Sequence, residues 1–540
     1  MTRSRLLAAA FVVSSTCTPS AWPQVPLEGE ILANSSTASS QTDARIFVDG
    51  TGATHVFWRD LGATGGHIKT RLFAADGSAG AESTIYGLSG GSDLYGAGTN
   101  RRGDAVLVYS AELTDWALRF DRTGSLVGEP LAVNDPALFW DGSADAAVGA
   151  DGRFVVAMHS RQVVPLAPHQ GIVARVYTAR GEPRTALFKV SDDPERHQHN
   201  PSVASDAAGN FTLFWTSATD SDDYRTHLRR YDANGVALGP VVDPTPPGGG
   251  DQLAWDIAMD PAGNSAIFWG KGNGPWDDVW ARLFGPNGQP KGEAFRVNQV
   301  QPSAQYFAAA DMDSSGNFVV TWESAVQEGR IGEIYARLFR PDGRPASDEF
   351  HVNQLSGQFE ETLPRVALSD DGVVALTWVN WYTGDGSAEA TMLRRYLATC
   401  APDATFLPLR NGRFLACARW ETTAGQRGSG VPANWSDESG GFWFFDDANL
   451  ELFVKLLDGC GINGHYWLYV SGLTDVGVDL ALLDTWTGAV RSYSRPRGVP
   501  FAAIQDVDAF STCNATPNPT AIQRFAHLPR VAPGVGPMCR

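Results

Sequence analysis

The chain repeats one short pattern seven times, and this repeat constrains its fold more than any other feature. A glycine that can close a turn is followed six residues later by a large side chain, across a β-branched and aromatic run. The seven pairs are Gly52/Trp58, Gly103/Tyr109, Gly152/Met158, Gly209/Trp215, Gly263/Trp269, Gly316/Trp322 and Gly372/Trp378. Successive glycines are 51, 49, 57, 54, 53 and 56 residues apart, which is too long for a helical hairpin repeat and fits a four-stranded unit.

A second motif follows the first and marks where the array ends. An aromatic residue precedes a turn glycine by four positions in the pairs Phe73/Gly77, Phe120/Gly124, Tyr177/Gly181, Tyr231/Gly235, Phe284/Gly288 and Phe339/Gly343. The seventh aromatic, Tyr396, has Cys400 at the turn position, so the array stops there. Residues 29–34 resemble the outer strand at 292–298, which the last unit lacks. The sequence therefore predicts an all-β fold in which a seven-bladed β-propeller (27–399) is closed by an N-terminal strand.

Side chains that recur in nearly every repeat are expected to be structural. The repeated tryptophans predict packing between neighbouring sheets rather than a ligand ladder. Six arginines lie two positions before the strand aromatic, and we expect them to stack on aromatic rings or pair with carboxylates. They are Arg71, Arg175, Arg229, Arg282, Arg337 and Arg394. Function is therefore to be sought where the repeats differ.

Charge and the N-terminal segment restrict the location and the partners. The net charge of −18 disfavours nucleic acid and anionic membranes, because phosphate binding needs clustered Lys and Arg. Residues 1–21 combine early arginines, an apolar run and small polar residues, which predicts a secretory signal peptide. Lipidation at Cys17 is a weaker alternative. No later stretch approaches a membrane span, so we expect a secreted or extracellular monomer, with the periplasm or the cell surface left open.

Cysteines and strand patterns predict a second domain. Cys400, Cys417, Cys460 and Cys513 indicate two disulfides in an exported protein, and the sequence leaves their three pairings open. Cys539 lies in the tail. Apolar runs separated by Asp, Asn and Gly predict a small β-sandwich over 400–514. Residues 515–540 are rich in Pro and lack periodicity, so we expect a flexible tail.

The second domain contains an ordered series of short characteristic segments: residues 411–414, 441–445, 449–452, 454–455, 457–460, 463–464, 466–467, 472–475, 484–485, 487–488, 509–510 and Cys513. In these segments the domain resembles an uncharacterised C-terminal domain family of secreted bacterial proteins. The family usually carries a second cysteine where this chain reads Thr405-Phe-Leu-Pro-Leu409. Either that bridge is lost or Cys417 has replaced its partner. The resemblance implies an accessory module without assigned catalysis. The repeats, with Ser315–Trp322 as the clearest, look like those of large secreted bacterial proteins.

The sequence contains few residue patterns that indicate a metal site. His197 and His199 could hold zinc on one face of a strand, with Asp192, Asp193 or Glu195 as a third ligand, but a polar loop is the simpler interpretation. Calcium could bind in the aspartate-rich stretches 311–316, 220–223 and 446–447, none of which has a complete calcium-loop spacing. Turn-forming aspartate is the simpler interpretation there. We therefore expect no cofactor, with calcium as the alternative.

The long loops at one end of the repeats offer the best ligand-site candidate. Trp276, Asp277, Asp278, Trp381 and Tyr382 combine aromatic rings with carboxylates, a mixture suited to stacking on sugars and bonding their hydroxyls. We expect them to bind an extracellular carbohydrate or protein. The alternative is that these aromatics pack against their own loops.

Two functional interpretations follow. The first is a secreted, non-catalytic binding or scaffold protein, because no sialidase Asp-box is present. The alternative is a propeller glycoside hydrolase or lyase acting on an extracellular glycan. Two carboxylates within roughly 10 Å across an open funnel would favour the enzyme.

Overall fold

The fold is described from a computed structural model of the 540-residue chain. The structure describes residues 25–35, 39–49, 51–62, 66–87, 93–111, 114–134, 140–160, 171–191, 196–219, 223–246, 250–272, 278–300, 304–327, 330–353, 360–381, 389–398, 400, 404–446, 449–518, 522 and 525–531. All statements below concern these residues.

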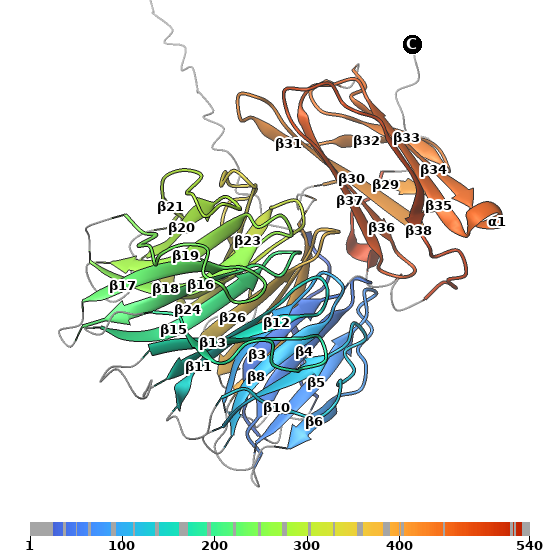
Figure 1. Cartoon of the computed structure of the whole chain (residues 1–540). Helices are drawn as coiled ribbons and strands as arrows, with labels where there is room; N and C mark the ends of the chain where they lie inside the picture. Colours follow the sequence, from blue (N-terminus) through green and yellow to red (C-terminus); the bar gives the residue numbers. More distant parts are fainter. Residues whose placement is uncertain are drawn as a thin grey trace, which may run out of the picture.

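The described residues up to Leu397 form seven antiparallel sheets (Figure 1). The first three sheets comprise β3 (Gln41–Val48), β4 (Thr54–Asp60), β5 (His67–Phe73) and β6 (Ser83–Gly87); β7 (Leu94–Thr99), β8 (Ala105–Ala111), β9 (Thr114–Phe120) and β10 (Leu131–Ala132); and β11 (Trp140–Val148), β12 (Phe154–Ser160), β13 (Gly171–Tyr177) and β14 (Phe188–Lys189). The next three comprise β15 (His197–Ser205), β16 (Phe211–Ala218) and β17 (Tyr224–Tyr231); β18 (Asp251–Met259), β19 (Ser265–Gly272), β20 (Asp278–Phe284) and β21 (Phe295–Arg296); and β22 (Gln305–Met312), β23 (Phe318–Gln327), β24 (Arg330–Phe339) and β25 (Phe350–His351).

The seventh sheet joins distant parts of the chain. It contains β26 (Glu361–Leu368), β27 (Val373–Trp381) and β28 (Glu389–Leu397), together with the N-terminal strands β1 (Val25–Pro26) and β2 (Ile31–Leu32). Strand β2 pairs with β28 through Ile31 opposite Leu393. The residues around 31 thus occupy the outer-strand place that the sequence pattern assigns to them.

The repeated glycines and large side chains have the structural roles that the pattern predicts. Gly209 has a φ of 83° and closes the turn between β15 and β16, where its N–H donates to the Asp206 carbonyl oxygen at 3.1 Å. The large residues lie in the second strand of each sheet, and all five repeated tryptophans are fully buried. The core clusters combine side chains of neighbouring sheets, as in the cluster shared by Phe268 and Trp322. The prediction that these tryptophans are core residues is confirmed.

The repeated arginines fasten neighbouring sheets together. The guanidinium groups of Arg71, Arg229, Arg282, Arg337 and Arg394 lie 5.0 to 6.0 Å from the ring centres of the strand aromatics. Their Nη1 groups also donate to carbonyl oxygens of the preceding sheet, as Arg337 does to Val297 at 2.7 Å. The predicted structural role is confirmed for these five arginines.

Two further sheets follow Cys400 and share one core. The first contains β29 (Leu407–Leu409), β30 (Phe414–Glu421), β31 (Arg427–Ser429), β36 (Gly477–Asp484) and β37 (Val490–Arg495). The second contains β32 (Val431–Ser436), β33 (Ser439–Trp443), β34 (Leu452–Gly459), β35 (His465–Gly472) and β38 (Ile504–Phe510), with α1 (Cys460–Asn463) between β34 and β35. Phe414 and Leu480 of one sheet pack with Phe442 and Leu468 of the other.

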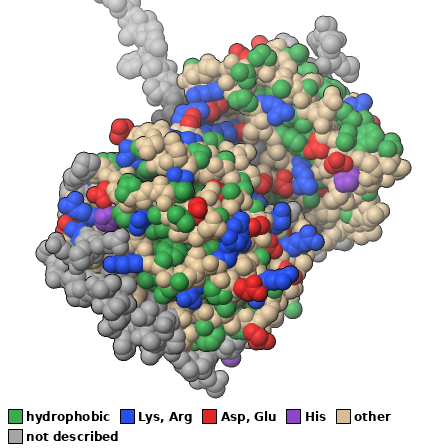
Figure 2. All heavy atoms as spheres, viewed as in Figure 1, with side chains coloured by type: hydrophobic (Ala, Val, Ile, Leu, Met, Phe, Trp, Pro, Cys, Tyr) green, Lys and Arg blue, Asp and Glu red, His purple; other side chains and the backbone are tan. Residues whose placement is uncertain are grey.

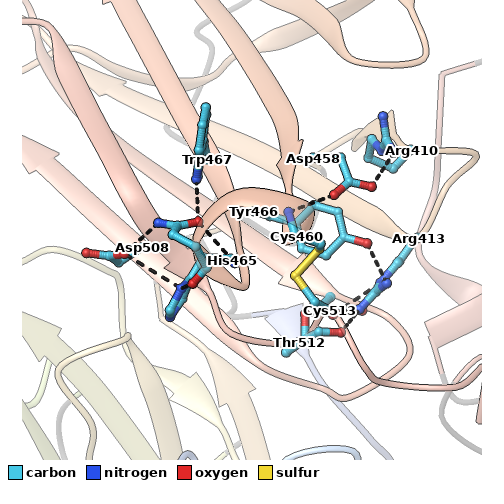
Figure 3. Close-up of a disulfide and its surroundings, with 12 residues drawn as sticks. Arg410, Arg413, Asp458, Cys460, His465, Tyr466, Trp467, Asp508, Thr512 and Cys513 are labelled. Atoms are coloured by element: carbon cyan, nitrogen blue, oxygen red, sulfur yellow. Dashed lines mark hydrogen bonds and ion pairs between the residues drawn. A yellow bond between two sulfur atoms is a disulfide. The ribbon is translucent and has the colours of Figure 1, made fainter.

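Two disulfides confirm the prediction from the cysteine count. They join Cys400 to Cys417 and Cys460 to Cys513. Figure 3 shows the second bond beside Arg413, whose guanidinium donates to the Tyr466 hydroxyl at 2.8 Å and to the Thr512 carbonyl oxygen at 2.7 Å. This network ties the end of β38 to β30.

The region after Cys400 packs against the seventh sheet. Leu415 and Leu483 share a buried cluster with Val373 and Leu397. Charged groups surround this junction, where Figure 2 shows acidic and basic side chains side by side. Arg491 of β37 contacts Asp371 at 2.8 Å across the junction.

The C-terminal segment corrects one expectation. The sequence suggests a flexible tail over 515–540, but Phe525 and Leu528 are buried in the junction cluster. Phe525 begins the short helix η1 (Phe525–His527), and the Phe406 N–H donates to the Pro529 carbonyl oxygen at 2.8 Å. Burial of these two side chains outweighs the disorder that the proline content favours.

Candidate functional site

One position of the repeat places a residue from each of the seven sheets around a central cavity. It lies seven residues before the repeated glycine and pairs with the residue that precedes the repeated large side chain. In order along the chain, these residues are Arg45, Gly96, Asp145, Ser202, Asp256, Ala309 and Arg365. We call them the channel ring. All seven line one cavity of about 980 Å³.

A bulge in every first strand precedes the channel ring. The pairing register of each such strand shifts just before the ring position, as between Leu94 and Gly96 or between Ala254 and Asp256. In four strands a non-glycine residue of the bulge has a positive φ near 50°, a conformation that is costly for bulky side chains. These residues are Asp43, Asn200, Phe307 and Leu363. Strain of this kind is concentrated at functional sites in proteins.

Two carboxylates of the ring meet at one hydroxyl group. The Ser202 Oγ lies 3.0 Å from Asp256 Oδ1 and 3.3 Å from Asp145 Oδ2. Because both contacts are to one atom, the two carboxylate oxygens lie at most about 6.3 Å apart, a limit that includes the roughly 5 to 5.5 Å used by retaining glycosidases. A serine hydroxyl carries one proton, so it can donate to one carboxylate only. The second contact is a hydrogen bond only when the other carboxyl group is protonated and donates to the serine oxygen.

The surroundings favour one proton shared by the pair near neutral pH. Burial, and after it the charge of Asp256, raises the pKa of Asp145 to about 7, against the opposing effects of the Val203 N–H at 2.9 Å and the charge of Arg45. Burial also raises the pKa of Asp256, against the N–H groups of Ala310 and Ile257, both at 2.8 Å, and the Ser202 hydroxyl. The arrangement can therefore supply a carboxylic acid and a carboxylate side by side near neutral pH.

Aromatic side chains line the same cavity. Tyr95, Trp255 and Phe307 belong to the bulges of the second, fifth and sixth sheets. Trp255 lies over Gly270, where an added Cβ would come within 2.5 Å of the indole. Phe307 is 47% exposed despite its size. Exposed ring faces beside carboxylates form the mixture of groups that binds sugars.

Charged groups narrow the cavity at the end formed by the first turns of the sheets. Arg101, from the second sheet, donates to the Leu368 carbonyl oxygen of the seventh at 2.8 Å. Its guanidinium also lies 3.7 Å from Asp311 and 3.9 Å from Asp370. Arg491, from the region after Cys400, lines the cavity at this end too.

The residues singled out from the sequence do not line this cavity where they are described. Trp276, Asp277 and Tyr382 lie outside the described residues. Asp278 accepts a hydrogen bond from Asn298 at 2.8 Å and lies 3.9 Å from Arg296 within its own sheet. Trp381 ends β27 with 37% exposure. The ligand site at these five residues therefore stays a prediction.

The metal-site candidates were predicted at two places, the histidine pair of one strand and the aspartate-rich turns. His197 and His199 lie in β15, and burial, followed by the charges of His159 and His197, lowers the pKa of His199 to about 4. Their proposed partners Asp192, Asp193 and Glu195 lie outside the described residues. Within the described part of the chain, no group of three His, Cys, Asp or Glu side chains is arranged to hold a metal ion. Asp313 accepts two backbone N–H bonds of its own turn, as expected for a turn-forming aspartate.

The sequence contained a signal for the channel ring that loop composition does not reveal. Counting seven residues back from each repeated glycine gives Arg, Gly, Asp, Ser, Asp, Ala and Arg. The charge at this position varies from repeat to repeat, whereas the turn glycines and core residues stay nearly constant. Such a position is a candidate for a function that differs between the sheets.

Comparisons with known proteins identify no family. No family model and no curated protein sequence matches the chain. The resemblance of residues 400–513 to a C-terminal domain family therefore stays a prediction. No helix among the described residues is long and apolar enough to cross a membrane.

Solved structures similar to the chain are β-propeller proteins of low sequence identity. A protein of unknown function from Dyadobacter fermentans is 12% identical with a TM-score of 0.43, over 70% of this chain and all of that one. The α-L-arabinofuranosidase of Fusarium graminearum is 12% identical with a TM-score of 0.39, over 69% of this chain and 98% of that one. The α-L-arabinanase of Penicillium chrysogenum is 12% identical with a TM-score of 0.37, over 60% of this chain and 99% of that one.

The first functional interpretation from the sequence is corrected. The sequence favours a non-catalytic binding or scaffold protein, because no sialidase Asp-box is present along the chain. Glycoside hydrolases occur among the similar structures. Within this chain, the paired carboxylates of Asp145 and Asp256 meet the criterion that separates the two interpretations. The motif search missed them because they are far apart in sequence.

Proposed function

We propose that the chain is a propeller-type glycoside hydrolase that acts on an extracellular glycan. The observation that carries the proposal is the contact of Asp145 and Asp256 with one Ser202 hydroxyl inside the central cavity. In this proposal, the seven sheets are the seven blades of a propeller over 27–399, closed by the N-terminal strand. Residues 400–514 form a β-sandwich, and residues 1–21 direct export, for which two disulfides are suitable.

The chemistry follows from the protonation states of the pair. Asp145, protonated near neutral pH, donates its proton to the glycosidic oxygen as the bond to the anomeric carbon breaks. The ionised Asp256 attacks that carbon and forms a covalent glycosyl ester. Asp145, now a carboxylate, takes a proton from water, whose oxygen displaces Asp256. The short distance between the two carboxylates, which both contact one hydroxyl, supports this two-step route, since a one-step inverting route needs room for water between the groups.

The aromatic residues would position the sugar. Tyr95, Trp255 and Phe307 can stack on the apolar faces of sugar rings and hold the glycosidic bond beside the pair. The loop residues Trp276, Asp277, Asp278, Trp381 and Tyr382 would extend binding beyond the cavity.

The proposal is tested with purified protein and a panel of arabinan, galactan, xylan and polygalacturonate. Release of reducing ends is measured for the wild-type protein and for Asp145→Asn and Asp256→Asn. We expect release from at least one glycan and a loss of at least about 1000-fold in each variant. Asp313→Asn is the matched control, because it changes a carboxylate of a turn outside the cavity lining. Equal activity in wild type and both pair variants, or no release by folded protein, contradicts the proposal.

A further inference from the structure

The channel ring separates positive from negative charge. Asp145, Ser202 and Asp256 come from the third, fourth and fifth sheets, whereas Arg365 and Arg45 come from the seventh and first, which lie next to each other. Gly96 and Ala309 separate the two groups and place almost no side chain in the cavity. A ligand beside the carboxylate pair therefore has arginine side chains facing it.

The two arginines differ in how their donors are used. Arg45 donates through Nη1 to the Ala44 carbonyl oxygen at 2.9 Å and through Nη2 to the Leu94 carbonyl oxygen at 3.0 Å. It also donates to the carbonyl oxygen of Tyr95. Arg45 is thus fixed in place by the bulge of the second sheet and contributes mainly its charge.

Arg365 keeps most of its donors available. Its Nη1 donates to the Pro364 carbonyl oxygen at 2.8 Å, and no other hydrogen bond or ion pair of this guanidinium occurs with the described residues. A guanidinium group has five N–H donors in a planar fork. Arg365 lines the cavity, so the unused edge of this fork can meet a ligand there.

The surroundings of the arginines are unfavourable without an anion. Burial, followed by the charge of Arg365, lowers the pKa of Arg45 to about 9, and burial lowers the pKa of Arg365. Asp43, Asp145 and Asp256 offset this effect through space, although none of them pairs directly with Arg365. An anion bound in a planar, bidentate manner would supply the missing partner.

We infer that Arg365, supported by the charge of Arg45, binds an anionic group of the glycan, so that the substrate class is an acidic polysaccharide. This inference rests on the proposed function. The carboxylate of a uronic acid matches the planar fork best, and a sulfate ester has the same charge chemistry. The anionic group would fix the sugar across the cavity from the Asp145–Asp256 pair.

Binding is measured by calorimetry with the full chain carrying Asp145→Asn and Asp256→Asn, which keeps the ligand intact. The probes are trigalacturonate, galactotriose and a sulfated galactotriose. We expect trigalacturonate to bind at least about tenfold more tightly than galactotriose, and Arg365→Met to remove that preference. Arg122→Met, which removes an exposed arginine outside the cavity, should leave it unchanged. Preference for the sulfated probe over trigalacturonate would assign the site to sulfate.

Two outcomes distinguish this inference from the proposed function. Equal binding of acidic and neutral probes, or an acidic preference that survives Arg365→Met, overturns the inference even if the wild-type protein cleaves neutral glycans. Binding that depends on Arg365, without cleavage of any glycan by the wild-type protein, supports the anion site and contradicts the hydrolase proposal.

Discussion

Trp215 donates its indole N–H to the side-chain oxygen of Gln198 at 2.5 Å, and both residues are fully buried. The position of Gln198, eleven residues before the repeated glycine, also holds glutamine in the first, fifth and sixth sheets, as Gln41, Gln252 and Gln305. The seventh sheet has Glu361 there instead, fully buried in contact with Asn380. One repeat therefore carries an acid where four others carry its neutral amide.

Glu361→Gln should stabilise the protein above neutral pH. Burial, followed by the charge of Glu30, raises the pKa of Glu361 to about 9, from an ordinary value of 4.5. Protonated Glu361 contributes its full stabilisation below pH 4.5. This stabilisation is lost as the pH rises towards 9, because Glu361 ionises at a lower pH in the unfolded chain than in the folded protein. We expect the variant to gain roughly 1 to 3 kcal/mol at pH 8 and nothing at pH 4, measured by denaturant unfolding. The converse variant Gln305→Glu should lose stability at pH 8, and a gain there would contradict this explanation.

Gly96→Ala should impair hydrolysis through the position of Asp145. A Cβ at residue 96 would lie 2.6 Å from the Ala144 carbonyl oxygen and 2.7 Å from Asp145 Oδ1, so the third sheet must shift. We expect at least about a tenfold loss in kcat, because small displacements of a catalytic group are costly. Gly292→Ala is the matched control, since an added Cβ meets nothing within 4 Å there. Equal kcat values for the two variants would show that the ring tolerates displacement.

The pH dependence of hydrolysis should follow the protonation of Asp145. The pKa of Asp145 is raised to about 7, so the fraction that can donate a proton falls as the pH rises past 7. We expect kcat/KM to decline about tenfold per pH unit above that value. Ser202→Ala removes the hydroxyl that contacts both carboxyl groups. We expect this variant to have a lower kcat and a shifted pH at which kcat/KM begins to decline. A flat profile between pH 6 and 9 in the wild type would exclude Asp145 as the acid.

Asp479→Asn should loosen the junction between the seven sheets and the region after Cys400. Burial alone would raise the pKa of Asp479, but Arg340, then Arg419, reverse this and hold it well below its usual range. The pair with Arg340 crosses the junction, and Arg419 lies at 3.1 Å. Because the substitution removes the carboxylate partner of the buried Arg419 and the half-buried Arg340, we expect a loss of roughly 3 kcal/mol at pH 7. Calorimetry should resolve separate transitions, whereas the exposed control Asp475→Asn should unfold like the wild type.

Much of the framework could be predicted because it depends on local patterns. The turn glycines, the buried tryptophans and the arginines over the strand aromatics each repeat at a fixed spacing, so the sequence pattern shows their roles directly. The channel ring could not be predicted in the same way, because the bulges before Arg45 and Asp256 set which side chains face the cavity. Bulges have no strong local signal. The burial of Phe525 in the Pro-rich C-terminal segment could not be predicted for a related reason, because it packs with residues distant in sequence, such as Leu415.

Arg101 connects parts of the ring of sheets that are not neighbours. Its hydrogen bond to the Leu368 carbonyl oxygen joins the second sheet to the seventh, and its guanidinium lies 3.7 Å from Asp311 of the sixth sheet. One side chain therefore links three sheets across the cavity, in addition to the contacts that each sheet makes with its neighbours.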